Sequence, residues 1–193
     1  MKKIVAVLAA SVLLSGVASA REVSVGLGSV DPDKGKSWTQ TEVAYKSAAT
    51  LPKVGVVDYV AKAELAKNAR TLGVAAGRKL AVKGATVTPS LELGAGERDV
   101  FIKKKKSVLV DERSYGFWGA GVTAEYPLTQ KLTAEGQVRY RESLTDDVKF
   151  DETRVGAGVN YSLAEDRKIG LQGWQTDGTV KATAVAVKLS QKF

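Results

Sequence analysis

The sequence predicts an all-β protein: a closed, antiparallel, up-and-down transmembrane β-barrel of about ten strands. Three observations predict this fold. Residues 1–20 have the composition of an export signal, the rest of the chain alternates apolar and polar residues at period two, and the aromatic residues fall in two groups near strand ends.

The first twenty residues have the three parts of a secretory signal peptide. Lys2 and Lys3 form a basic region, Ile4–Leu14 is apolar, and Ala18–Ala20 offers small residues for cleavage. The apolar run is too short to span a bilayer. We therefore expect cleavage after Ala20, with residues 21–193 forming the folded domain; the alternative is a buried N-terminal helix.

The composition excludes several kinds of catalytic site. The chain has no Cys and no His, which removes the usual zinc sites, Ser-His-Asp triads and Cys nucleophiles. Loss of residues 1–20 takes away two lysines and lowers the formal charge from +8 to +6. A chain of this length suits one domain. We expect no enzyme, no cofactor and no metal site.

Period-two alternation predicts the strands of the first half of the chain. These predicted strands are 23–27, 41–45, 57–65, 72–76 and 91–95. The turn sequence at 31–36 separates the first two. Residues 54–76 also have a helical interpretation, because the segment is rich in Ala and Lys and places Glu64 near Lys67. Eight strands are therefore the alternative to ten.

The same pattern continues through the second half. The predicted strands there are 118–126, 132–140, 155–163, 169–171 and 185–189. Gly occupies many alternate positions in 118–126 and 155–163, where it leaves room on the polar face. The polar faces also carry Thr, Asn, Gln and charges of both signs, which suits a filled lumen.

The apolar face decides between a soluble sheet and a membrane barrel. It consists mostly of Ala and Val with few bulky residues. The core of a soluble sandwich needs more bulk, because its inner faces must interdigitate. Lipid makes no such demand, so the pattern favours a membrane barrel with its apolar face outward. The alternative is a soluble periplasmic β-barrel that carries an apolar ligand.

The aromatic residues predict two girdles at the membrane–water interfaces. With the N-terminus on the periplasmic side, one group falls at the periplasmic strand ends and the other at the outer ends. The periplasmic group is Tyr45, Tyr126, Tyr161 and Phe193; the outer group is Trp38, Trp118 (or its neighbour Phe117), Tyr140 and Trp174.

A signal peptide, alternating strands and a last strand ending in Phe193 together resemble bacterial small outer-membrane β-barrel proteins. The size is similar to that of the OmpX and OmpA-barrel kind and, more loosely, to small monomeric sugar-acid porins. The resemblance implies location in the cell outer membrane and an assembly signal read by the barrel-assembly machinery. The matching residues are Val185, Val187, Leu189 and Phe193. Gln191 departs from the pattern, since an apolar residue is usual there.

The inward faces of the predicted strands carry charges of both signs. The candidate lumen residues are Glu42, Lys62, Glu64, Arg78, Glu92, Glu125, Glu135, Arg139, Arg141, Arg154 and Lys168. One interpretation is a basic strip that passes or binds small anionic solutes. The other, which we favour, is an ion-pair network that fills a narrow barrel, because barrels of eight to ten strands are mostly filled by side chains.

Two loops carry concentrated charge. Lys103, Lys104, Lys105 and Lys106 form a basic run in the longest outer loop, which is either a solvated tip or a contact for outer-membrane lipid and lipopolysaccharide phosphates. Its flanks could expose a sheet edge to a partner. The acidic group Asp146, Asp147, Asp151 and Glu152 could do acid–base chemistry or bind calcium, but we interpret it as a solvated loop. No nucleotide or nucleic-acid motif occurs.

Overall fold

The computed structural model describes residues 19–33, 35–66, 69–104, 107–145 and 148–193 as one antiparallel sheet. None of these described residues forms a helix long and apolar enough to cross a membrane. The strands are β1 (Ser19–Pro32), β2 (Trp38–Leu51), β3 (Gly55–Ala66), β4 (Ala69–Gly77), β5 (Leu80–Val82), β6 (Ala85–Lys104), β7 (Ser107–Pro127), β8 (Leu132–Ser143), β9 (Asp151–Ser162), β10 (Arg167–Gly178) and β11 (Ala182–Lys192).

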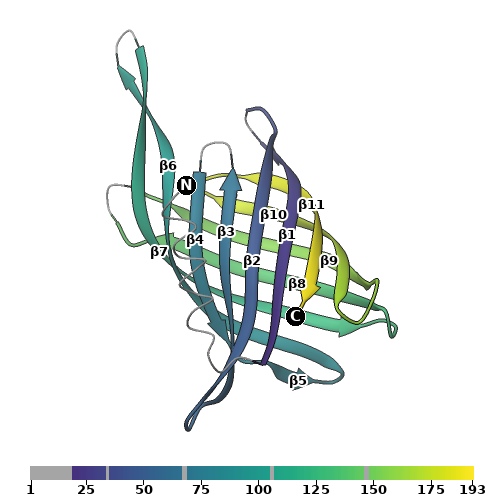
Figure 1. The fold of residues 1–193 in the computed structure, drawn as a ribbon. Helices are drawn as coiled ribbons and strands as arrows, with labels where there is room; N and C mark the ends of the chain where they lie inside the picture. Colours follow the sequence, from purple (N-terminus) through teal and green to yellow (C-terminus); the bar gives the residue numbers. More distant parts are fainter. Residues whose placement is uncertain (1–18, 34, 67–68, 105–106, 146–147) are drawn as a thin grey trace.

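The sheet closes on itself into a ten-stranded barrel, as predicted. Strands that follow one another in the chain pair with each other, except β4 and β5; β1 pairs with β11, and β4 pairs with β6 to complete the ring (Figure 1). β5 is an extra strand that pairs only with the first residues of β6. Lys83 and Gly84, with φ of 47° and 86°, make the two-residue turn between them.

Within the segment 54–76, Gly55–Ala66 forms β3 and the residues from Ala69 onward form β4, so the helical alternative for this segment is wrong. Lys62 lies opposite Ala44 on β2 and Gly73 on β4, with its side chain turned to the lumen. Tertiary pairing therefore overrides the helical propensity of Ala and Lys.

The two ends of the barrel differ. β1 begins and β11 ends at the same end, with Glu22 opposite Lys192. We call this the termini end; the turns after β2, β4, β7 and β9 also lie there. The opposite end, which we call the loop end, carries the β1–β2, β3–β4, β6–β7, β8–β9 and β10–β11 connections. The longest projection is the β6–β7 hairpin, which extends well beyond the barrel wall (Figure 1).

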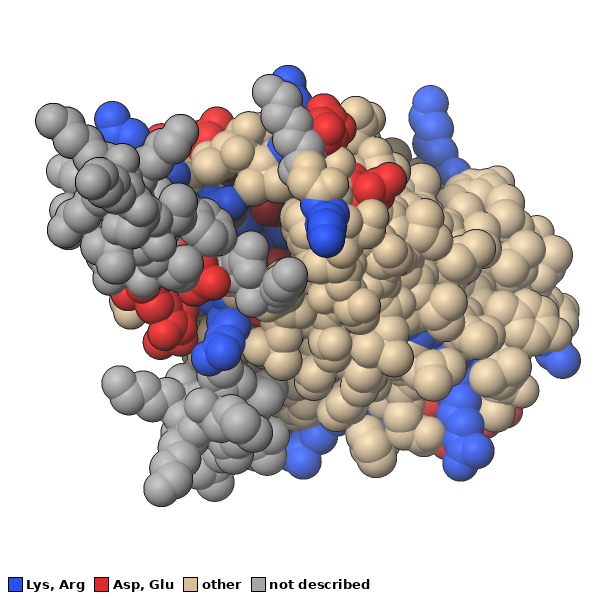
Figure 2. Space-filling model, turned by 90° about the horizontal axis from the view of Figure 1, so that it is seen from above, with Lys and Arg blue, Asp and Glu red and all other residues tan. Residues whose placement is uncertain are grey.

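Successive side chains of a strand point alternately outward and into the lumen. On β6, Leu91 and Leu93 are 68% and 66% exposed, whereas Glu92 between them is 7% exposed. The flank of the molecule is correspondingly a broad surface without charge, with Lys, Arg, Asp and Glu at its margins (Figure 2). Leu91 and Leu93 therefore point outward and Glu92 points inward, which is the arrangement of a membrane barrel.

Two residues of the predicted outer girdle lie inside the barrel instead. Trp38 pairs with Val30 and Trp174 pairs with Ala184, and both rings pack on these buried side chains. The prediction was wrong here because it used the position of each Trp along the strand and ignored which face the register gave it. Trp174 has the same parity as Gln172, which faces the lumen.

The other predicted girdle residues lie on the outward face. Trp118 and Tyr140 stack edge to face with ring centroids 5.7 Å apart. Tyr45 shares its face with Val43 but is only 6% exposed, whereas Tyr126 and Tyr161 are 51% and 44% exposed. Phe193 is 77% exposed, and its backbone N–H donates a hydrogen bond to the Arg21 carbonyl (2.8 Å).

A pair of glycines tests this division between faces. Gly94 faces the lumen, where an added Cβ would overlap the Phe117 ring and the Leu72 carbonyl oxygen; Gly136 faces outward with nothing within 4 Å. We expect Gly94→Ala to lower the free energy of unfolding by about 1–3 kcal/mol through overpacking. Gly136→Ala should leave it unchanged or raise it by about 0.4–1 kcal/mol. Urea unfolding in lipid, followed by heat-modifiable gel migration, measures both; equal losses would contradict the assignment.

Candidate functional site

Glu64 is the centre of the charged lumen. From β3 it accepts hydrogen bonds from three arginines on β8 and β9. Arg139 reaches Oε1 at 2.9 Å, Arg154 reaches the same oxygen at 3.4 Å, and Arg141 reaches Oε2 at 2.7 Å. Residues far apart in the strand order therefore meet across the interior, and their contacts occupy the lumen.

Arg141 is the most enclosed charge, with only 2% of its surface exposed. It holds Glu92 on β6 through two hydrogen bonds, Nε to Oε2 (2.9 Å) and a terminal nitrogen to Oε1 (2.5 Å). The guanidinium also lies 4.9 Å from the centroid of the Phe117 ring. Such bidentate geometry fixes the side chain and compensates much of its desolvation.

Glu152 completes the cluster. It pairs with Arg139 at 2.8 Å and with Arg154 at 3.3 Å, and the Arg154 guanidinium lies 5.2 Å from the Trp174 ring. The resulting set, which we call the lumen network, has three arginines and three glutamates. Its members are Glu64, Glu92, Arg139, Arg141, Glu152 and Arg154. Because the formal charges cancel, this level of the lumen offers no surplus of either sign.

Aromatic side chains cover the lumen network on the loop-end side. Tyr115 and Phe117 of β7 pack with Val148 and Phe150, which the β8–β9 connection brings into the barrel mouth. Arg98 lies 5.8 Å from the Phe150 ring centroid. We call Tyr115, Phe117, Val148 and Phe150 the aromatic cap. Phe117 and Tyr115 are 0% and 4% exposed, so the cap side chains are tightly packed next to the network.

The termini-end half of the lumen is hollow. A cavity of about 790 Å³ extends from the lumen network to rim residues such as Glu22, Lys79 and Lys192. We call it the vestibule. Its basic lining residues are Lys46, Lys62, Arg78, Lys79, Arg139, Arg154, Lys168, Lys188 and Lys192, and its acidic ones are Glu22, Glu42, Asp58, Glu92, Glu125 and Glu135. The lining therefore carries more positive than negative charge.

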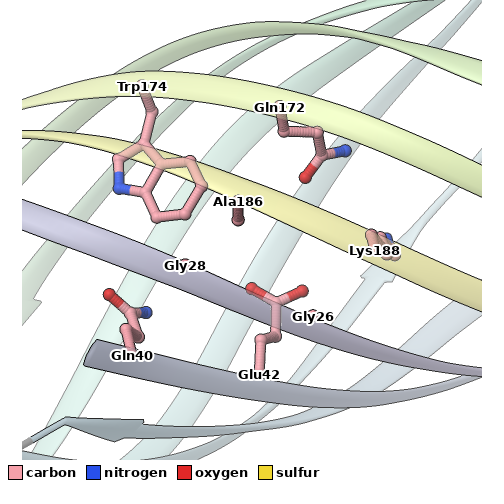
Figure 3. Close-up of a pocket in the computed structure, with 8 residues that line it drawn as sticks. All are labelled: Gly26, Gly28, Gln40, Glu42, Gln172, Trp174, Ala186 and Lys188. Atoms are coloured by element: carbon pink, nitrogen blue, oxygen red, sulfur yellow. The ribbon is translucent and has the colours of Figure 1, made fainter.

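A much smaller pocket lies beside the vestibule (Figure 3). Gly26 and Gly28 of β1 and Ala186 of β11 form its floor, and Trp174 and Gln40 face one another across them. Its volume is about 20 Å³, which is room for a single water molecule and not for a solute. The small residues of β1 and β11 thus leave a gap in the lumen lining, and the larger side chains around them fill most of that gap.

The structure places the predicted lumen charges on the inward face or at the rim. Glu42 and Lys62 form an ion pair at 3.3 Å, and Glu135 accepts hydrogen bonds from the Asn160 and Gln172 amides. The following predicted residues line the vestibule: Glu42, Lys62, Arg78, Glu92, Glu125, Glu135, Arg139, Arg154 and Lys168. Glu64 and Arg141 lie deeper, within the lumen network.

Sequence reasoning missed Glu152 and Lys188 as lumen residues. Glu152 was grouped with the acidic loop residues, but its parity matches that of Arg154 on the same strand, which was the available signal. Asp151 has the outward parity, and Asp146 and Asp147 lie outside the described residues. Within the described part of the chain, no group of three or more acidic side chains could hold a metal ion.

The two other predicted sites are placed in part. Lys103 and Lys104 are the last residues of β6, near the hairpin tip, whereas Lys105 and Lys106 lie outside the described residues. Residues 1–18 of the predicted signal peptide also lie outside them.

In the predicted assembly signal, Val185, Val187 and Leu189 face outward and are about half exposed. Gln191 donates a hydrogen bond to the Asp166 carboxylate (2.6 Å), which lowers the pKa of Asp166 below its usual value.

Comparison with solved structures identifies the fold. The chain is similar to the β domain of the Bordetella autotransporter BrkA, with a TM-score of 0.55 and 9% identity over 91% of this chain and 100% of that one. It is also similar to the KdgM porin in complex with disordered oligogalacturonate, with a TM-score of 0.51 and 9% identity over 89% and 99%. No protein-family model and no curated protein matches the chain. The fold is therefore that of an outer-membrane β-barrel, as the resemblance implied.

Removing Arg141 tests the lumen network. Arg141→Leu would leave Glu92 without its buried partner and would remove one of the three arginines that contact Glu64. We expect it to lower the free energy of unfolding by about 3–5 kcal/mol. Adding Glu92→Gln should recover part of this loss, because the orphaned charge is gone. The control is Lys181→Gln, which breaks an exposed ion pair with Asp177 and should cost no more than about 1 kcal/mol. Similar costs for the Arg141 and Lys181 variants in urea unfolding would argue against the network.

Proposed function

We propose that this chain is an integral outer-membrane β-barrel whose lumen is sealed at the loop end, and that it has a structural or surface-interaction role. One observation carries the proposal: the charge-balanced lumen network lies under the aromatic cap, and the enclosed Arg141 ties the two together through Phe117. A solute crossing the barrel would have to break several charge-assisted hydrogen bonds in a dry site.

The distribution of polarity supports the membrane location. Leu27, Leu91 and Leu93 are each more than half exposed on the outward face, while the interior holds ion pairs. A soluble barrel carrying an apolar ligand would need the reverse arrangement, with an apolar cavity and a polar exterior. The polarity of this barrel is the opposite of what that alternative requires.

The second candidate function is a narrow diffusion channel for small acidic solutes. The positive surplus of the vestibule lining favours it, since basic linings attract anions. The similar KdgM porin structure also contains oligogalacturonate. In this version the aromatic cap and the lumen network would have to rearrange to let a solute pass.

Three partners complete the proposal. The outward band contacts lipid, the hairpin tip at Lys103–Lys106 contacts lipopolysaccharide, and the barrel-assembly machinery reads the last strand through Val185, Val187, Leu189 and Phe193. Gln191 departs from the apolar pattern of this signal. Its amide donates a hydrogen bond to Asp166 and accepts one from Arg167 at the rim. The proposal includes no catalytic step.

Planar-bilayer recording of the refolded protein tests the sealed lumen. We expect no steady conductance from the unmodified chain. Phe117→Ala combined with Arg141→Ala removes the contact between cap and network and should produce a measurable conductance. Trp118→Ala, which changes the adjacent outward-facing ring, is the control and should remain silent. Steady anion-selective current through the unmodified protein would refute the sealed lumen and establish the channel.

Replacing Lys103–Lys106 with Gln tests the lipopolysaccharide contact. Since the attraction is electrostatic, we expect weaker binding to lipopolysaccharide and a smaller dependence of binding on salt concentration. Binding to vesicles coated with lipopolysaccharide, measured over a salt series, provides the comparison. Identical curves for the two proteins would remove the hairpin tip from the proposal.

A further inference from the structure

The vestibule has cations that the protein itself does not neutralise. Lys46 pairs with Glu22, Lys62 with Glu42 and Lys79 with Asp58, while Arg139 and Arg154 belong to the lumen network. Within the described residues, four other basic residues of the lining have no ion pair. They are Arg78, Lys168, Lys188 and Lys192.

The acidic lining residues do not offset these four. Glu22, Glu42, Asp58 and Glu92 are already engaged by the partners named above and by Arg141. Glu135 accepts hydrogen bonds from two amides, which stabilise its charge without an ion pair. Among the lining residues that the structure describes, only Glu135 and Glu125 are left to balance four cations, so this lining keeps a positive surplus.

Three of the unpaired lysines surround one point of the lumen wall. Lys188, Ser190 and Lys192 share the inward face of β11, and Lys168 of β10 lies directly opposite Ser190. The residues beside Lys188 on both neighbouring strands are glycines, Gly26 and Gly170, so no side chain in its row covers it. Lys188 also borders the small pocket of Figure 3. The cluster is therefore open toward the cavity.

A cavity with walls of low dielectric concentrates the field of such a cluster. Cations without partners in a confined site are costly, and a ligand of opposite charge removes that cost. We propose that the vestibule is an anion-binding chamber that takes a small multivalent oxyanion, carboxylate or phosphate, from the termini end and holds it near Lys168, Lys188 and Lys192. The inference rests on the proposed function, because a sealed lumen makes the chamber a blind end and not a passage.

Cysteine labelling measures the charge of the chamber directly, because the chain has no native Cys. Ser190→Cys places a nearly isosteric thiol among the three lysines, and Ala164→Cys places one on the exposed β9–β10 turn at the same end. In nanodiscs, we expect the ratio of labelling rates with anionic and cationic methanethiosulfonate reagents to be on the order of tenfold higher at position 190. The excess should shrink as salt is raised.

Charge-removal variants and added ligands complete the test. In the Ser190→Cys background, Lys168→Gln with Lys188→Gln should bring the ratio close to that at position 164. Lys131→Gln with Lys149→Gln, which removes the same charge at exposed sites outside the vestibule, should not. Citrate and inorganic phosphate should slow labelling at position 190, and spermidine should not; protection by only one of the two anions identifies the ligand as a carboxylate or a phosphate.

The two proposals fail in different measurements. A ratio at position 190 equal to that at position 164, with no protection by either anion, would overturn the anion-binding chamber. Current through the same preparation in a planar bilayer would instead overturn the sealed lumen. The labelling ratio would still report the positive charge around position 190.

Discussion

The absence of water from the bilayer core is the constraint on which this structure depends. Every backbone N–H and C=O in hydrocarbon needs a partner within the protein, and a sheet satisfies this only by closing. The pairing of β1 with β11 and of β4 with β6 achieves closure. A closed sheet has one face toward lipid and one toward the lumen, so the alternation of Leu91, Glu92 and Leu93 becomes an inside and an outside.

Closure of the sheet encloses charged side chains in a narrow lumen. Such charges are tolerated only when they are paired. Around Glu64, long arginines from β8 and β9 reach across the barrel, and glycines such as Gly73 and Gly119 leave the space that their contacts occupy. Toward the termini end the charges are no longer fully paired. Lys168, Lys188 and Lys192 face a hollow space there, without carboxylate partners among the described residues. The lumen therefore has a charge-balanced part beneath the aromatic cap and a cationic, hollow part toward the termini end.

The sequence predicts the fold well because alternation is a local signal. Ten strands, their antiparallel order and the inward position of Arg139, Arg141 and Arg154 all follow from parity within single strands. Pairings between strands are not local, so the sequence could not show that Glu64 would meet all three arginines. Trp38 and Trp174 show a second limit of sequence-based prediction. Their positions near strand ends did not reveal that their side chains point into the lumen. Glu152 was missed because a strand boundary was placed a few residues too late.

Two adjacent residues of β6 test which face of the sheet contacts lipid and which faces the lumen. An environment-sensitive fluorophore is attached to Leu91→Cys or to Ser90→Cys in a bilayer that contains brominated lipid. Leu91 is 68% exposed on the outward face, and Ser90 lines the vestibule. We expect a blue-shifted, strongly quenched emission at position 91 and a red-shifted, unquenched emission at position 90. The reverse pattern would place the charged face toward lipid and rule out the orientation described here.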